Sequence, residues 1–93
     1  MSQQIRIHAI VQGQVQGVSY RAFTQRRAQS LQLTGWVRNQ RDGSVEMEIQ
    51  GPADQVNLLL ESAKQGPEHA RVTALNSHPV DIIAGESGFD ITG

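Results

Sequence analysis

Two hydrophobic periods alternate along this chain, and their order restricts the fold more than any other feature of the sequence. Residues 4–12 carry an apolar side chain at every second position, which is typical of a half-buried strand. Over residues 20–32 the period changes to that of an amphipathic helix. The inward side chains of the strand are Ile5, Ile7, Ala9 and Val11, and the helical stripe is Tyr20, Phe23, Ala28 and Leu31, with Arg26 and Gln29 outside it.

Strand and helix patterns continue to alternate along the rest of the chain. The predicted elements are strands at residues 36–40 and 44–50, a helix opened by Gly51-Pro52 and ended by Gln65-Gly66-Pro67, a strand at residues 69–80 and a short strand at Phe89 and Ile91. Asp42-Gly43 predicts a two-residue hairpin turn, since both residues tolerate positive φ. The order β-α-β-β-α-β, with a possible short fifth strand, predicts an α+β ferredoxin-like sandwich, in which two helices cover one face of an antiparallel sheet. We expect one domain over residues 1–93.

Composition excludes several kinds of chemistry. The chain has no cysteine, which excludes disulfides, thiol catalysis and cysteine-ligated metals. His8, His69 and His78 lack metal-ligand spacing and are interpreted as surface or strand residues, so we expect no metal and no cofactor. The first ten residues lack the pattern of a signal peptide, and no stretch is long enough to span a membrane. The sequence therefore predicts a soluble, cytoplasmic protein.

Charge is distributed unevenly along the chain. Residues 1–41 contain six arginines and no acid, and residues 42–93 contain all nine acids against Lys64 and Arg71, so net charges of +6 and −7 sum to −1. Solvated faces would explain this asymmetry, and so would a basic region that attracts an anion. A nucleic-acid site would normally bring a basic overall balance and exposed aromatics, and the chain has only four aromatic residues. A small anion therefore fits the basic first half of the chain better than a nucleic acid does.

A glycine-bracketed loop, "VQGQVQGVSYR" at residues 11–21, connects the first predicted strand to the first helix. Backbone N–H groups at a helix N-terminus, together with the helix dipole, form an anion site. Gly13 and Gly17 allow the positive φ and close approach that such a loop needs, and Arg21 can place a guanidinium fork over phosphate oxygens. The G-x-x-x-G spacing matches neither a dinucleotide fingerprint nor a nucleotide P-loop. Simple turn chemistry and a solvated arginine remain the alternative interpretation of this loop alone.

Two long motifs resemble the signature segments of the acylphosphatase family. The first, G-x-V-Q-G-V-x-aromatic-R, runs from Gly13 to Arg21, and the second, G-aromatic-V-R-N-x-x-x-G-x-V-x-x-x-x-x-G, runs from Gly35 to Gly51 with Asn39 in the diagnostic place. The resemblance covers the whole chain and implies the same fold. The sequence departs from the family pattern at Tyr20, where phenylalanine is usual, and in "FDITG", which has no aromatic after its Phe-x-Ile segment.

The resemblance implies hydrolysis of acyl phosphates to a carboxylate and inorganic phosphate. Arg21 would bind the phosphoryl group and stabilise the transition state, and Asn39 would orient the attacking water. The phosphoryl group would also be held by the backbone amides of Gln14, Val15, Gln16, Gly17, Val18, Ser19 and Tyr20. The implied partners are a small acyl phosphate and inorganic phosphate, the latter as product and competitive inhibitor. We expect a monomer that binds no nucleic acid and no membrane.

Other candidate residues have simpler interpretations. Glu46 and Glu48 alternate along a strand, so we expect them to be solvated rather than to form a catalytic pair. Ser19 is not expected to act as a nucleophile, because no histidine lies at a telling position beside it. Arg38 and Arg41 are expected to steer anions or to lie in water.

Two functions from other classes remain as alternatives. One is a non-catalytic anion-binding module, or a detached relative of the acylphosphatase-like domains in larger carbamoyl-transfer proteins; a phosphate binder has no need of Asn39. The other is a small RNA-binding domain on the same fold, which requires aromatics on the central strands, where only Trp36 is available.

Overall fold

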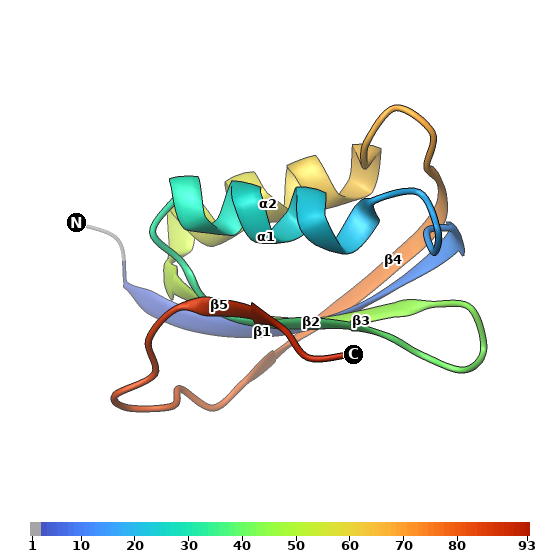
Figure 1. The fold of residues 1–93 in the computed structure, drawn as a ribbon. Coiled ribbons are helices and arrows are strands. Elements are labelled where there is room, and N and C mark those ends of the chain that lie inside the picture. The colour runs from blue at the N-terminus through green and yellow to red at the C-terminus, as the bar shows by residue number, and fades with distance from the viewer. Residues whose placement is uncertain (1–2) are drawn as a thin grey trace.

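The computed structural model describes residues 3–93 and shows two helices packed on one face of a five-stranded sheet (Figure 1). The elements are β1 (Gln4–Gln14), α1 (Tyr20–Ser30), β2 (Thr34–Asn39), β3 (Val45–Pro52), α2 (Ala53–Gln65), β4 (Arg71–Val80) and β5 (Phe89–Ile91). The predicted α+β ferredoxin-like sandwich is confirmed, including the short fifth strand. Within residues 3–93, neither helix is long and apolar enough to cross a membrane.

The strands lie in the order β4-β1-β3-β2-β5. The first four strands pair antiparallel, as expected, but β5 pairs parallel with β2, so the sheet is mixed. The reason is the connection between β4 and β5. The chain reverses direction after β4, which runs opposite to β2, and residues 81–88 carry it to the other edge of the sheet (Figure 1). This return brings residues 91–93 alongside the end of β2.

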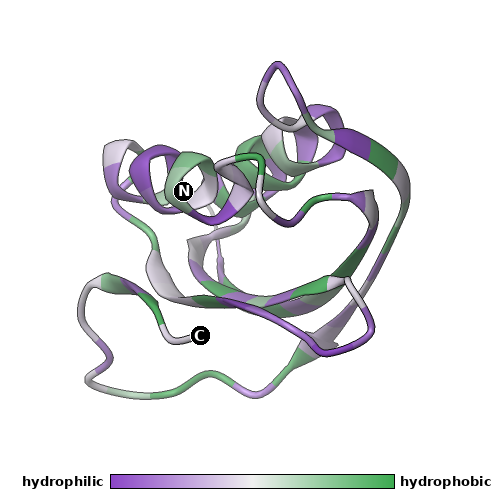
Figure 2. Ribbon diagram, turned by 45° about the vertical axis from the view of Figure 1, so that its right-hand side comes forward, coloured by the Kyte–Doolittle hydropathy of each residue, from purple (hydrophilic) through white to green (hydrophobic). Residues whose placement is uncertain are grey.

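The hydrophobic core lies between the sheet and the helices. Alternating side chains of β3 and one face of α2 are buried in it: Val45, Met47, Ile49, Val56, Leu59 and Ala63. The alternation of hydrophobic and hydrophilic residues is visible along the ribbon in Figure 2. In α1 the stripe differs from the prediction, because Thr24 is buried and Phe23 is only half-buried. Thr24 fits in the core because its hydroxyl donates to the Tyr20 carbonyl at 3.0 Å.

The β2–β3 hairpin is confirmed, but its turn is longer than the predicted two residues. Gln40 N donates to Ser44 O at 2.8 Å, which closes a three-residue loop over residues 41–43. Of these residues only Gly43 has positive φ, at 94°. Asp42 serves as an acceptor instead: its Oδ1 lies 2.9 Å from Ser44 N and 2.6 Å from Ser44 Oγ.

Part of the charge asymmetry is neutralised on the face of the sheet that the helices do not cover. Arg6 is fully buried there, with its Nε 2.7 Å from Glu48 and its Nη1 2.7 Å from Glu86. Arg6 Nη1 also donates to Gln50 Oε1 at 3.0 Å. Burial alone would raise the pKa of Glu86, but hydrogen bonds from Arg6 and Thr34, together with the Arg6 charge, outweigh burial and lower that pKa. The residue 81–88 segment is thereby fixed across the sheet.

The solvated glutamates expected on β3 are instead paired. Glu48 contacts Arg6, and Glu46 lies 2.7 Å from His8 Nε2 and 2.6 Å from Arg38 Nη2. The sequence interpretation was wrong here because it treated β3 without its neighbours: β1 and β2 flank β3 and place basic side chains beside both carboxylates. Within residues 3–93, ion pairs account for only two of the six N-terminal arginines, leaving Arg21, Arg26, Arg27 and Arg41 outside them.

Candidate functional site

The loop between β1 and α1 is attached to the sheet by two residues. Val15 is buried in the core. The Gln16 side chain donates from Nε2 to Gln40 O and to Ser44 O, both at 2.8 Å. These bonds join the loop to the β2–β3 hairpin, so the loop is held at both its strand end and its middle. The sequence indicated only a backbone role for Gln16, because nothing in the pattern shows that its side chain reaches a hairpin so distant in the sequence.

Both loop glycines have positive φ, but for different reasons. Gly13 (φ 126°) lies at the register shift between β1 and β4, and a Cβ there would come within 2.0 Å of Arg71 O. Gly17 (φ 73°) lies in the open loop, where a Cβ would meet no atom within 4 Å. Gly13 is therefore required by strand packing, whereas Gly17 is required by the loop conformation itself.

The N-terminus of α1 is open toward this loop. Ser19 occupies the N-cap position with left-handed φ of 65°, and in the described chain its side chain makes no capping hydrogen bond. The first helical bond runs from Phe23 N to Ser19 O at 3.0 Å, so the preceding N–H groups of α1 lie before the start of the helical ladder. Within residues 3–93 the first turn holds no acidic residue. These features favour an anion.

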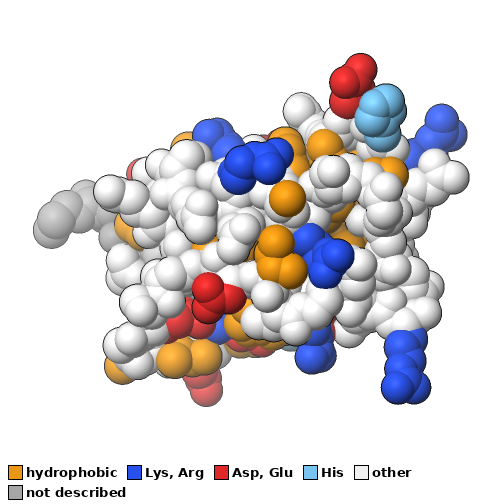
Figure 3. Space-filling model, in the orientation of Figure 1, with side chains coloured by type: hydrophobic (Ala, Val, Ile, Leu, Met, Phe, Trp, Pro, Cys, Tyr) orange, Lys and Arg blue, Asp and Glu red, His pale blue; other side chains and the backbone are white. Residues whose placement is uncertain are grey.

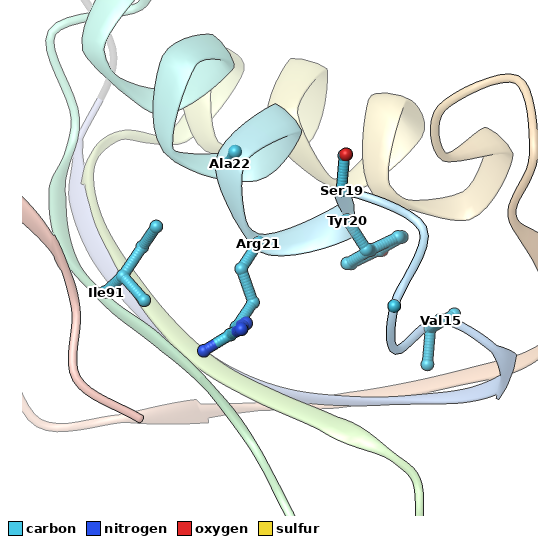
Figure 4. A pocket seen from close by; sticks show the side chains of 7 residues that line it. Val15, Ser19, Tyr20, Arg21, Ala22 and Ile91 are labelled. Atoms are coloured by element: carbon cyan, nitrogen blue, oxygen red, sulfur yellow. The ribbon is translucent and has the colours of Figure 1, made fainter.

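Arg21 projects from the first turn of α1 into a cavity of about 180 Å³. Figure 4 shows its side chain pointing from the helix toward the sheet. The cavity is lined by Val15, Gly17, Ser19, Tyr20, Arg21, Ala22 and Ile91. Arg21 Nη1 donates to Gly93 O, and within residues 3–93 its Nε and Nη2 have no hydrogen-bond partner. Two nitrogens of the guanidinium fork are therefore free to bind oxygens of a ligand.

Asn39 lies at the end of β2, close to the same carbonyl. Its backbone N–H donates to Gly93 O at 3.1 Å, so Arg21 and Asn39 are joined through one oxygen atom. Asn39 shares strand parity with Val37, which is fully buried under the helices. Its side-chain Oδ1 is buried and accepts no hydrogen bond from any residue of the described range 3–93. A buried acceptor of this kind calls for a partner that the protein itself does not supply.

A second hollow, of about 420 Å³, lies on the Asn39 side of this contact. Its lining comes from the end of β2, the hairpin and the last two residues: Arg38, Asn39, Gln40, Arg41, Thr92 and Gly93. Figure 3 shows Lys and Arg side chains around the C-terminus and toward the hairpin, whereas the acidic side chains visible in that view lie elsewhere on the face. Of the two arginines that line this hollow, Arg38 is paired with Glu46, so the excess positive charge beside it comes from Arg41.

Tyr20, the departure from the usual phenylalanine, is accounted for by helix packing. Its hydroxyl donates to Ala63 O at 2.6 Å and so connects α1 to α2. Burial raises the pKa of this hydroxyl well above its usual range. The side chain therefore stays uncharged and serves helix packing. The part of Tyr20 that remains a candidate for the site is its backbone amide.

The structure brings some of the predicted residues together and leaves others apart. Val15, Gly17, Ser19 and Tyr20 of the loop line the cavity that Arg21 enters, whereas Asn39 borders the second hollow and is linked to Arg21 through Gly93 O. Gln14, Gln16 and Val18 line neither hollow, and the sequence did not indicate that Ile91 and Gly93 border them. Both of these last residues are placed there by the pairing of β5 with β2. Among residues 3–93, no three His, Cys, Asp or Glu side chains are grouped so that they could hold a metal ion.

Comparisons with known proteins agree on one family. The family model described as Acylphosphatase matches residues 7–91. An acylphosphatase of Methylococcus capsulatus is 52% identical over 86 residues, covering 92% of this chain and 94% of the relative, and one of Salinibacter ruber is 44% identical over 86 residues, covering 92% and 90%. The crystal structure of acylphosphatase from Bacillus subtilis has a TM-score of 0.91 at 34% identity, covering 96% of this chain and 99% of that one.

Proposed function

The chain belongs to the acylphosphatase family of acyl phosphate hydrolases, and on that premise we propose how its residues carry out the reaction. The substrate is a small acyl phosphate, and the products are a carboxylate and inorganic phosphate. The loop from Gln14 to Tyr20 and Arg21 bind the phosphoryl group, and Asn39 orients the water. The observation that carries this proposal is the buried Oδ1 of Asn39, which has no hydrogen-bond partner within residues 3–93. The backbone N–H of the same residue and Arg21 Nη1 both donate to Gly93 O.

The phosphoryl group binds where backbone dipoles and an unpaired cation converge. Three features support this placement: the N–H groups that precede the α1 ladder, the positive φ of Gly17, and the free Nε and Nη2 of Arg21. Nε and Nη2 can take two phosphoryl oxygens side by side, as guanidinium forks do. Because Nη1 is already bound to Gly93 O, the fork is held in one orientation before the substrate arrives.

Asn39 binds the attacking water through Oδ1, which accepts one of the water's hydrogens. The water oxygen forms a bond to phosphorus while the bond from phosphorus to the acyl oxygen breaks, and the bonding pair leaves with the carboxylate. The proton lost by the water goes to a phosphoryl oxygen, so no side-chain base is needed. A carboxylate is a good leaving group, and the protein contributes positioning and charge stabilisation.

The two alternative functions receive less support. A non-catalytic phosphate module would use Arg21 and the loop, but it gives no reason for a buried acceptor at Asn39 beside them. An RNA-binding sheet needs exposed aromatics, yet the open face of the sheet has Trp36 beneath the Arg38 guanidinium, 5.3 Å from the ring, with Glu46 and Glu48 next to them.

We further propose that inorganic phosphate inhibits by occupying the substrate's place, and that the protein acts as a single-domain monomer without a nucleic-acid or membrane partner. The cytoplasmic location stays a prediction. Phosphate should also raise the melting temperature, because it binds only the folded chain.

The proposed activity is tested by incubating the purified protein with acetyl phosphate and measuring inorganic phosphate. We expect release far above the spontaneous rate, inhibited competitively by added phosphate. The Arg21→Ala variant provides the background for contaminating phosphatases. Release at the spontaneous rate by a folded protein would reject hydrolysis of this substrate class.

Activity is expected to survive exhaustive chelation. The proposed site consists of backbone amides, a guanidinium and a carboxamide, and none of its steps requires a metal ion. The measurement is phosphate release before and after dialysis against a chelator, with a known zinc-dependent phosphatase as the positive control. Loss of activity that a divalent ion restores would overturn the proposed chemistry.

Gly17→Ala is expected to weaken phosphate binding by about five- to tenfold. A residue with a Cβ is strained at a φ of 73° by roughly 1–2 kcal/mol, and relaxing this strain would turn loop N–H groups away from the phosphoryl group. Isothermal titration with inorganic phosphate measures the change. Gly85→Ala is the matched control, because Gly85 has a φ of 78° and equally open surroundings but lies outside the site. Equal phosphate affinities in both variants would mean that the loop conformation does not serve binding.

A further inference from the structure

Ile91 is exposed at a position where the fold gives it no core to enter. It is 40% exposed, although it shares strand parity with Phe89, which is fully buried beneath α1. The two residues therefore point to the same face of β5, but Ile91 lies beyond the edge of the packed core. Instead it borders the cavity into which Arg21 projects. An apolar side chain exposed beside an anion site is not explained by packing.

The cavity has two chemically different sides. Figure 4 shows Ile91 and Ala22 on one side of the Arg21 side chain, and Val15, Ser19 and Tyr20 of the loop on the other. The loop side is the one to which the proposed function assigns the phosphoryl group. The side formed by Ile91 and Ala22 presents only hydrocarbon side chains, so it offers nothing to a phosphoryl oxygen.

The direction of the reaction assigns the apolar side to the acyl group. In phosphoryl transfer the attacking and leaving oxygens lie roughly in line with phosphorus. With the water held at Asn39, the leaving oxygen points away from Asn39. Asn39 borders the second hollow, lined by residues 38–41 and 92–93, which shares no lining residue with the cavity of Ile91. Arg21 borders the cavity, Gly93 borders the second hollow, and a hydrogen bond joins these two residues.

We propose that Ile91, with Ala22, forms the subsite for the acyl group and makes the enzyme prefer acyl phosphates with an apolar acyl chain. This inference rests on the proposed roles of Arg21 and Asn39. Ile91 contacts the substrate but takes no part in bond making, so it determines specificity. Its position depends on the parallel pairing of β5 with β2, in which Ile91 lies opposite Val37.

The test compares acetyl, butanoyl and hexanoyl phosphate, whose leaving carboxylates are nearly equal in basicity. Full burial of each methylene would give about a fourfold gain in kcat/KM, so on this partly open surface we expect about fivefold for each pair of methylenes. In Ile91→Ala the gain in kcat/KM for each added pair of methylenes should be about threefold smaller than in the wild-type enzyme. The inhibition constant for inorganic phosphate should stay within about twofold, because the phosphoryl site is unchanged.

Two variants serve as controls. Ile82→Ala removes an isoleucine that is equally exposed, at 47%, but lies in the residue 81–88 segment, and it should keep the wild-type dependence. Ile91→Val retains a branched apolar side chain on β5 and should restore most of the preference. A purely structural role for Ile91 would lower kcat/KM for all three substrates alike.

The inference is overturned if the wild-type enzyme shows no dependence on chain length, or if Ile91→Ala lowers all three rates equally. It is also overturned if succinyl phosphate, which matches butanoyl phosphate in length but ends in a carboxylate, is strongly preferred, because the acyl group would then lie beside Arg38 and Arg41. If the wild-type protein releases phosphate from none of these substrates, the proposed function fails, and the two failures are thus distinguishable.

Discussion

Arg21→Ala is expected to lose phosphate affinity and turnover together. In the proposed mechanism Arg21 touches the phosphoryl group in both the ground state and the transition state, and hydrogen bonds to a charged group are worth roughly 1.5–3 kcal/mol, or about ten- to hundredfold in binding. Charge that develops in the transition state adds to this loss, so kcat/KM should fall by about 10³-fold or more. Phosphate titration and steady-state kinetics measure the two losses separately.

Arg21→Lys is not expected to restore either property. A lysine ammonium cannot bind Gly93 O and two phosphoryl oxygens in one plane, as the guanidinium does. Arg26→Ala is the matched control, since Arg26 is exposed on the same helix and lies outside the cavity that Arg21 enters. Circular dichroism and the melting temperature establish that each variant folds. A folded Arg21→Ala protein with undiminished phosphate affinity would remove the anion site from this part of the molecule.

Asn39→Ala is expected to keep near-native phosphate affinity while kcat falls by about 10²-fold or more, the scale of a lost positioning or polar transition-state contact. The substitution removes the Oδ1 to which we assign the attacking water but leaves the backbone N–H that donates to Gly93 O. The orientation of Arg21 should therefore survive. The difference between the two variants separates phosphoryl binding from water positioning.

The control for this variant is Asn76→Ala, which removes an exposed asparagine from another strand, β4. It should match the wild-type enzyme in kcat and in phosphate affinity. Melting temperatures of both variants show whether the sheet is intact. A folded Asn39→Ala protein that turns over at a near-native rate would reject the water-positioning role.

Hydrophobic periodicity predicted the elements well because each strand and helix buries one face. The strict alternation in β3 corresponds to its buried side chains, and the apolar face of α2 corresponds to them at Val56, Leu59 and Ala63 but not at the half-buried Leu60. The stripe of α1 was less readable, since Thr24 becomes buried by satisfying its hydroxyl within the helix, while Phe23 shifts to a half-buried position. A hydrophobicity scale treats Thr24 as polar and takes no account of the hydrogen bond that its hydroxyl makes within the helix.

Features that depend on pairing between distant segments could not be obtained from local pattern. The parallel register of β5 follows from the path of residues 81–88, which is set in part by the bonds of Arg6 to Glu86 and of Gln50 to Ile83. The charge asymmetry along the sequence became cross-strand pairs for the same reason. The contribution of Ile91 and Gly93 to the site is a consequence of that register.

The sequence predicts residues for the candidate site but not the contacts among them. The two motifs identified Arg21, Asn39 and the loop, because each motif keeps its residues at fixed spacing. Sequence spacing could not show that Arg21 and Asn39 N–H share one carbonyl oxygen, or that Gln16 attaches the loop to the hairpin. These contacts connect parts of the chain that meet only after folding.

Hydrolysis in water enriched in ¹⁸O tests the central claim most directly, that water held by Asn39 attacks phosphorus bound at Arg21. Acetyl phosphate is hydrolysed by the purified protein, and mass spectrometry measures the label in phosphate and in acetate. We predict that the solvent oxygen enters inorganic phosphate, because the bond between phosphorus and the acyl oxygen is the one that breaks. Label found in acetate would show that water attacks the carbonyl carbon, which would contradict the account.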